Sequence, residues 1–230
     1  MVRNELDPMQ VASILHTSDA REVKRFLSSP PPSSVRTQWS RVSSILSANL
    51  GVAYFGADDA AIEEAERATC PWTDEIRELY RCVEHADHRR GLVLMPLGFE
   101  FMSLKSVVSH HELFVRLNVN PFYGEPPDIE TEMAKPAGSP GPMLPGFVAF
   151  AKAGADTLFV DTRSGPLHGC VNLLPDGDAP WQAPLWRSPS AMLEQLAFSL
   201  ERNATFEMRT ASWGKYQPYI EGDQLVWDPK

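Results

Sequence analysis

The chain has 230 residues, of which 43% are apolar and 22% charged, a composition typical of a folded globular protein rather than a disordered one. A chain of this length is expected to bury roughly 70% of its unfolded surface, so it should contain a substantial core. The 30 acidic residues outnumber the 21 basic ones and give a net charge of −9, which argues against nucleic acid or an anionic membrane as the partner. A basic protein partner is compatible with that charge.

The cysteines and the first residues favour a cytoplasmic protein. Cys70, Cys82 and Cys170 are an odd number without close paired spacing, which is typical of reduced thiols. Residues 1–7 lack the apolar stretch of a signal peptide, and no apolar run approaches the ~18 residues of a transmembrane helix. We therefore expect a cytoplasmic location.

Residues 1–33 are expected to form a helical N-terminal extension that ends in a proline-rich linker. Two short helical patterns lie between residues 8 and 28, and the prolines at 30–32 cannot continue a helix. The second pattern has a small apolar face made of Val23, Phe26 and Leu27. The main domain is then predicted to span residues 34–230.

Three amphipathic helices are predicted at the start of this domain. The first begins at Ser34 and can end at Gly51, Asp58 or Asp59 is placed to cap the second, and Thr73 can cap the third. Their apolar residues recur every three or four positions, which indicates helices that pack one face on a core.

Short elements and a long loop are predicted next. Residues 92–95 and 99–102 have the pattern of short strands, and Ser103 can cap a following helix. Residues 118–146 are rich in proline and glycine, so a long loop is the expected structure there.

The stretch 147–174 organises the predicted fold, because three apolar runs alternate in it with turn residues. A helix should begin at Ser188 and Pro189, and residues 216–227 read as a terminal hairpin. These elements together predict an α+β fold, in which helices flank a mixed, mostly antiparallel β-sheet.

The strands and turns of residues 147–174 carry a recognisable set of residues: Phe150, Ala151, Gly154, Asp156, Asp161, Gly165, Pro166, His168 and Gly169. This set resembles the signature of the SUKH superfamily, which includes the fungal Smi/Knr cell-wall assembly regulators. The preceding helices are similar to that family in outline through Ile62, Glu66, Pro71, Leu79 and Tyr80. The resemblance implies a SUKH-like domain that binds proteins and is not an enzyme. Many bacterial members of the family are immunity proteins that neutralise a partner toxin.

The sequence departs from the family pattern at two places. Cys70 stands where the family usually has a leucine before the proline. Residues 89–91, Arg-Arg-Gly, replace the Asn-Gly or Asp-Gly that often follows the third helix.

Patterns that would indicate a metal, a cofactor or a nucleophile are absent. The chain has no G-x-S-x-G, no P-loop, no G-x-G-x-x-G after a strand and no Cys-x-x-Cys. His110 and His111 are adjacent, so on a helix they point about 100° apart and cannot easily share a metal ion. His85 and His88 have a spacing suited at most to weak metal binding. We expect no metal and no cofactor.

Two sets of residues in and after the 147–174 stretch have alternative interpretations. Asp161 and His168, with Asp156 nearby, could form an acid–base group of a hydrolase, because loops that follow strands often carry catalytic residues. The favoured interpretation is structural, since aspartates in turns bond their own backbone and glycines adopt unusual dihedrals. Trp181, Trp186 and Trp213 lie in or beside predicted loops, where they would be either interface anchors for a partner or lids over a sheet edge.

The sequence therefore predicts a non-catalytic protein-binding module. Its most concrete form is an immunity protein that occludes a partner toxin, such as a basic nuclease. The alternatives are a regulator or scaffold of cell-wall synthesis and, from a different class, a hydrolase that uses Asp161 and His168.

Overall fold

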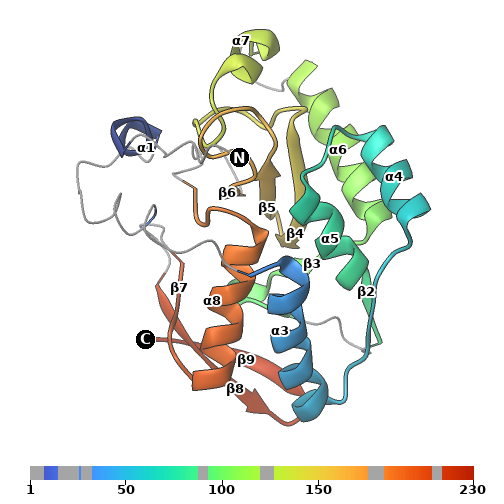
Figure 1. Ribbon diagram of the computed structural model, residues 1–230, viewed down its shortest axis with the longest axis vertical. Helices are drawn as coiled ribbons and strands as arrows, with labels where there is room; N and C mark the ends of the chain where they lie inside the picture. Colours follow the sequence, from blue (N-terminus) through green and yellow to red (C-terminus); the bar gives the residue numbers. More distant parts are fainter. Residues whose placement is uncertain are drawn as a thin grey trace.

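The computed structural model describes residues 8–14, 26, 33–87, 93–119, 127–175, 184–208 and 214–230. Helices and antiparallel sheets alternate within these residues, so the predicted α+β fold class is confirmed (Figure 1). The helices are α1 Pro8–Ile14, α3 Val35–Leu50, α4 Asp59–Ala68, α5 Asp74–Cys82, α6 Leu104–Val119, α7 Ile129–Ala134 and α8 Pro189–Arg202, with a 3₁₀ turn η1 at Pro96–Gly98.

The described strands form three separate sheets in which every pairing is antiparallel. The central sheet has the order β3-β4-β5-β6, and the two other sheets are β1-β2 and β7-β8-β9. The strands are β1 Tyr54–Phe55, β2 His85–Ala86, β3 Glu100–Phe101, β4 Phe147–Ala153, β5 Asp156–Asp161, β6 Val171–Leu174, β7 Phe206–Glu207, β8 Lys215–Glu221 and β9 Gln224–Pro229. The predicted antiparallel strands flanked by helices are confirmed, as are the three consecutive strands of residues 147–174, and the strands are divided among three sheets.

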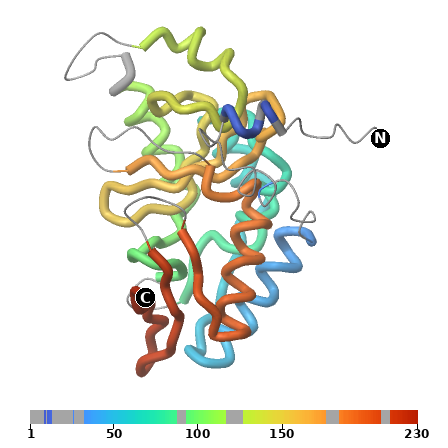
Figure 2. The backbone as a smooth tube through the Cα atoms, turned by 90° about the vertical axis from the view of Figure 1, so that its left-hand side faces the viewer, coloured from blue at the N-terminus to red at the C-terminus, as the bar shows by residue number. Residues whose placement is uncertain are grey.

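The helices pack on the central sheet and on one another. α6 lies along β4 and contacts α4, while α3 packs against both α5 and α8. α8 lies between α3 and the sheet β7-β8-β9 (Figures 1 and 2). The shared core is aromatic in its middle, where the rings of Phe147 and Phe159 stack at 4.4 Å on neighbouring strands.

The ends of three predicted helices are set by local capping hydrogen bonds. The hydroxyls of Ser34, Thr73 and Ser188 each accept a hydrogen bond from the backbone N–H three residues later. Asp58, rather than Asp59, caps α4, and Gly51 ends α3 with a φ of 66°. Such caps satisfy N–H groups that have no partner inside the helix, which is why these boundaries could be placed from the sequence.

Two predicted segments differ from the structure. The strand expected at residues 92–95 is reduced to a single bridge between Met95 and Phe99, and residue 92 lies outside the described residues. The segment 118–146 is not one long loop, because α7 forms inside it with Asp128 as its cap. Residues 120–126 lie outside the described part of the chain.

The N-terminal extension contributes α1 and the buried Phe26 to the described structure, and the rest of the second predicted helix lies outside it. α1 lies at the end of the molecule that also carries α7, opposite the hairpin β8–β9 (Figures 1 and 2). Among the described residues, none of the helices combines the length and apolar character needed to cross a membrane.

Candidate functional site

The turn after β5, residues 161–170, holds most of the family-motif residues, and we call it the motif turn. Asp161 ends β5 with a fully buried carboxylate, and Arg163 places an equally buried guanidinium against it. Arg163 Nη2 lies 2.8 Å from Asp161 Oδ2, and Nε lies 3.1 Å from Oδ1. The backbone N–H of Arg163 also donates to Oδ1 at 3.0 Å. The motif turn is thus built around a buried ion pair.

This ion pair also fixes the segment that contains α7. The backbone N–H of Gly138 donates to Asp161 Oδ2 at 2.7 Å. Arg163 donates through Nη1 to the carbonyl of Glu132 at 3.0 Å and through Nη2 to that of Ser139 at 2.7 Å. Its guanidinium carbon lies 5.0 Å from the ring centroid of Phe147. A buried ion pair is tolerated only when further hydrogen bonds satisfy both groups, and these contacts do so.

The motif glycines have backbone conformations that favour glycine. Gly154, Gly165 and Gly169 have φ values of 60°, 123° and 85°. A Cβ at Gly165 would lie 3.0 Å from Cβ of Pro136, so the close approach of the α7 segment also requires glycine there. Pro166 is half-buried beside it.

Asp161 and His168 do not form the acid–base pair that a hydrolase would need. His168 is exposed, and its Nδ1 lies 3.0 Å from the carbonyl oxygen of Arg163. The carboxylate of Asp161 is fully buried and bound by Arg163 and Gly138. Asp156 lies at the other end of β5, in register with Ala153. The hydrolase alternative thus lacks the contact on which it depends.

The structure places one of the three candidate tryptophans in the interior. Trp186 is only 6% exposed, bridges β6 at Val171, and donates from Nε1 to Gln195 Oε1 at 2.7 Å. It therefore covers the edge of the central sheet and offers no exposed face to a partner, which corrects its interpretation as an interface anchor. Trp181 and Trp213 lie outside the described residues.

The histidines of α6 face the central sheet. His110 Nε2 lies 3.2 Å from the hydroxyl of Thr157 on β5, and the His110 ring packs against Phe114 at 4.4 Å. Burial, with smaller contributions from the charges of Lys152 and His111, lowers the pKa of His110 to about 4. Burial also lowers the pKa of His111. Both are therefore neutral at pH 7.

The structure describes only one member of the other histidine pair, His85. His85 Nδ1 lies 2.8 Å from Glu84 Oε2, and the His85 ring stacks on Phe55. His88 lies outside the described residues. Within the ranges that the structure describes, no three His, Cys, Asp or Glu side chains gather as metal ligands would.

Cys170 is buried, and Cys70 and Cys82 are half-buried. Burial raises the pKa of Cys70 to about 11, and it also raises the pKa values of Cys82 and of the fully buried Cys170. Because the thiolate is the reactive form, these cysteines are poor nucleophiles at neutral pH.

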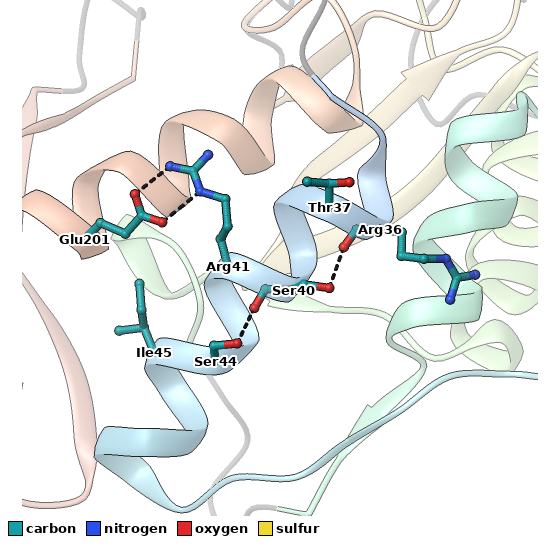
Figure 3. Close-up of a pocket in the computed structure, with 7 residues that line it drawn as sticks. All are labelled: Arg36, Thr37, Ser40, Arg41, Ser44, Ile45 and Glu201. Carbon is teal, nitrogen blue, oxygen red and sulfur yellow. Dashed lines mark hydrogen bonds and ion pairs between the residues drawn. The ribbon is translucent and has the colours of Figure 1, made fainter.

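An open hollow lies between α3 and α8, and most of the residues that line it are polar and hydrogen-bonded (Figure 3). Arg41 donates from Nε and Nη2 to the two carboxylate oxygens of Glu201 at 2.7 and 2.6 Å, and this hydrogen bonding lowers the pKa of Glu201. Arg36 pairs with Glu78, and the hydroxyls of Ser40 and Ser44 donate to backbone carbonyls of their own helix. The Arg41–Glu201 pair therefore joins the two helices at the hollow.

Comparison with known proteins adds no relative, since no protein-family model and no curated protein matches the chain. The resemblance to the SUKH superfamily thus rests on the motif residues themselves. Sequence reasoning missed Arg163, the partner that explains the buried Asp161. The signal that could have found it is an arginine two residues after an aspartate at the end of a buried strand.

Proposed function

We propose that the protein is a non-catalytic, SUKH-like protein-binding module, and most concretely an immunity protein that neutralises a partner toxin in the cytoplasm. The observation that carries the proposal is the state of the motif turn. Its two chemically capable side chains, Asp161 and His168, are engaged with Arg163 rather than with each other. Because these side chains hold the fold, they are not free to act in catalysis. This supports a role in which the protein binds a partner through its surface and not in a cleft.

The charge of the surface supports a basic partner. The first turns of α4 expose Asp58, Glu63 and Glu64, and the whole chain carries a net charge of −9. Complementary charge accelerates the encounter of two proteins and is weakened by salt. A toxin that acts on nucleic acid is basic and would fit such a surface.

The decisive experiment expresses the neighbouring reading frame with and without this protein. We expect the neighbour to be toxic alone, and co-expression to restore growth and yield a complex on co-purification. Toxicity that persists under co-expression, with no complex formed, would refute the immunity role. Co-purification of an enzyme of wall synthesis instead would support the regulator alternative.

The charged surface is tested in the same complex. Reversing Glu63 and Glu64 to lysine should slow association about tenfold or more at low salt, because the negative field that steers a basic partner towards α4 is weakened. The matched control reverses Asp223 and Asp228, which are exposed on the distant hairpin β8–β9. If both pairs of substitutions slowed association equally, only the net charge would matter, and α4 would not be part of the interface.

A further inference from the structure

The strand β9 is an unpaired edge of the sheet β7-β8-β9. It is six residues long, and among the described strands only β8 pairs with it. The other edge strands are shorter or bridged, since β1, β2, β3 and β7 have two residues each and Trp186 bridges β6 at Val171. Proteins usually shorten, cover or interrupt such edges, because their free backbone groups can pair with the strand of another chain. Within the described part of the chain, β9 is the exception.

The free backbone groups of β9 belong to Leu225 and Trp227. In an antiparallel hairpin, successive residues alternate between bonding the neighbouring strand and pointing away from it. The N–H of Lys230 donates to the carbonyl of Lys215 at 2.8 Å, so the even-numbered residues of β9 bond β8. The N–H and C=O groups of Leu225 and Trp227 therefore point away from β8. The turn η1 contacts β9, but no backbone group of the described residues bonds these four groups.

A proline protects the edge on the other side of the same hairpin. Pro218 lies on β8, beyond Lys215 and Tyr216, which pair with β7. The residues on either side of Pro218 bond β9, so its backbone nitrogen faces the unpaired side of β8 and has no N–H to donate there. β9 has a proline only at its last residue, Pro229. The hairpin thus blocks one edge against a further strand and leaves the other able to accept one.

An apolar pair lies beside the unpaired edge, on the face of the hairpin that is turned away from the core. Leu225 is only 6% exposed and marks the face that packs on the core. Tyr219 on β8 and Val226 on β9 are opposite each other in the register and share the other face. Tyr219 is 40% exposed and Val226 is half-buried. A strand added to β9 would therefore extend an apolar contact that the hairpin already begins.

A second copy of β9 matches this edge in its hydrogen bonding. An antiparallel pairing about a two-fold axis through Val226 places Leu225 opposite Trp227 of the second copy, and the reverse. Each of these pairs exchanges two N–H···O=C bonds, so the free groups of one copy satisfy those of the other. Val226 lies opposite Val226 of the second copy. Tyr219 and Val226 of both copies then form one apolar row across the axis.

The charges along the strand are compatible with this pairing. Asp228 of one copy lies opposite the neutral Gln224 of the other. Lys230 lies opposite Gly222 of the other copy, whose neighbours Glu221 and Asp223 are acidic and exposed. No like charges are directly opposite each other, an arrangement that would destabilise the pair. β9 is thus complementary to itself in charge as well as in hydrogen bonding.

We propose that β9 is a dimerisation strand, through which two copies of the chain pair antiparallel about Val226 and join their three-stranded sheets into one. The occupant of the edge is a second copy rather than a different protein, because the strand complements itself in hydrogen bonding, apolar contact and charge. The proposal does not rest on the toxin-immunity role, because it involves the hairpin β8–β9 and not the acidic surface of α4.

Sedimentation equilibrium of the full-length chain tests the pairing with two matched lysine substitutions. The wild type should show a mass that rises with concentration from 25.6 kDa towards twice that value. Val226→Lys should raise the dissociation constant of the dimer about tenfold or more, because two lysines then face each other at the axis. Gln224→Lys adds the same charge to the same face of β9, but opposite Asp228, so the dissociation constant should stay the same or fall. A wild type that is monomeric at every concentration, or equal effects of the two substitutions, would overturn the proposal.

A disulfide tests the register, and it does so even if Val226→Lys fails to fold. Val226→Cys places two thiols at a non-hydrogen-bonded pair, where Cα atoms are about 4.5 Å apart and a disulfide can form. Gln224→Cys is the control, because its two thiols would lie about 13 Å apart along the strands. Both are made with Cys70→Ser and Cys82→Ser, which remove the half-buried thiols. After oxidation, we expect a covalent dimer of Val226→Cys alone; cross-linking of both variants or of neither would refute this register.

Discussion

The protein contains two arginine–carboxylate pairs of similar geometry in very different surroundings. Arg41 and Glu201 join α3 to α8 at the surface, with side chains 31% and 33% exposed. Arg163 and Asp161 join the motif turn to the α7 segment, with side chains that are fully buried. The closest contacts are 2.6 and 2.8 Å. The two pairs thus differ in burial far more than in distance.

That difference decides what each pair does for the fold. Water solvates the exposed pair whether or not it forms, so its net contribution to stability is small. The buried pair cannot return to water without opening the turn, and each partner depends on the other to offset its lost solvation. The buried pair is therefore expected to set the structure of its region, whereas the exposed pair adds to a contact already made by apolar side chains of α3 and α8.

The largest expected effect comes from breaking the buried pair on one side. Arg163→Met keeps most of the side-chain volume but leaves Asp161 charged, buried and without its main partner. We expect a loss of about 3–5 kcal/mol in the free energy of unfolding, measured by urea denaturation at pH 7. The carbonyls of Glu132 and Ser139 also lose their donor, so amide exchange in residues 132–139 should accelerate beyond the global change.

The double variant Asp161→Leu, Arg163→Met is the control for this prediction. Because it removes both charges, it should recover part of the loss, as hydrophobic replacement of a buried ion pair often does. If Arg163→Met alone cost less than 1 kcal/mol, the pair would not organise this region.

The sequence predicted the parts of the fold whose causes are local. Ser34, Thr73 and Ser188 cap their helices through contacts three residues away, and the strands of residues 147–174 follow from short apolar runs. α7 was missed because the prolines of residues 118–146 outweighed its short helical stretch. Asp128 was the available signal, as it accepts a hydrogen bond from the N–H of Thr131.

The candidate site was harder to predict from the sequence than the fold, because it depends on contacts between residues that are distant in the chain. Asp161 was expected to bond its own turn, and it does accept from the N–H of Arg163. Its bond from Gly138 spans 23 residues, and no periodicity or turn pattern indicates such a contact. The burial of Trp186 has the same origin, because its partners on β6 and α8 are brought together only by the complete fold.

Lowering the pH should reduce the stability of the protein less than Arg163→Met does, because it creates an unpaired charge at His110. His110 has its pKa lowered to about 4 in the folded protein, whereas the unfolded chain takes up the proton near the usual value of 6.5. Between these values the unfolded state binds more protons, so stability falls as the pH is lowered from 6.5 towards 4. Allowing for the partial exposure of the ring, we expect a loss on the order of 1–2 kcal/mol from this residue.

The measurement is the urea midpoint at several pH values across that window. His110→Gln retains a group that can bond the hydroxyl of Thr157 and cannot titrate, so its pH dependence should be shallower. A curve parallel to that of the wild type would show that protonation of His110 does not limit stability in acid. His111 adds a change of the same sign, since its pKa is also lowered by burial.

The smallest effect is expected at the exposed pair. Arg41→Met should reduce the free energy of unfolding by about 0.2–1 kcal/mol, because solvent screens the charges and ordering two long side chains costs entropy. A double-mutant cycle with Glu201→Gln isolates the coupling between the two side chains from other losses at either position. The coupling should decrease further in 1 M NaCl, where the screening length is about 3 Å. A coupling as large as the effect of Arg163→Met would mean that geometry outweighs burial, and the contrast between the two pairs would no longer hold.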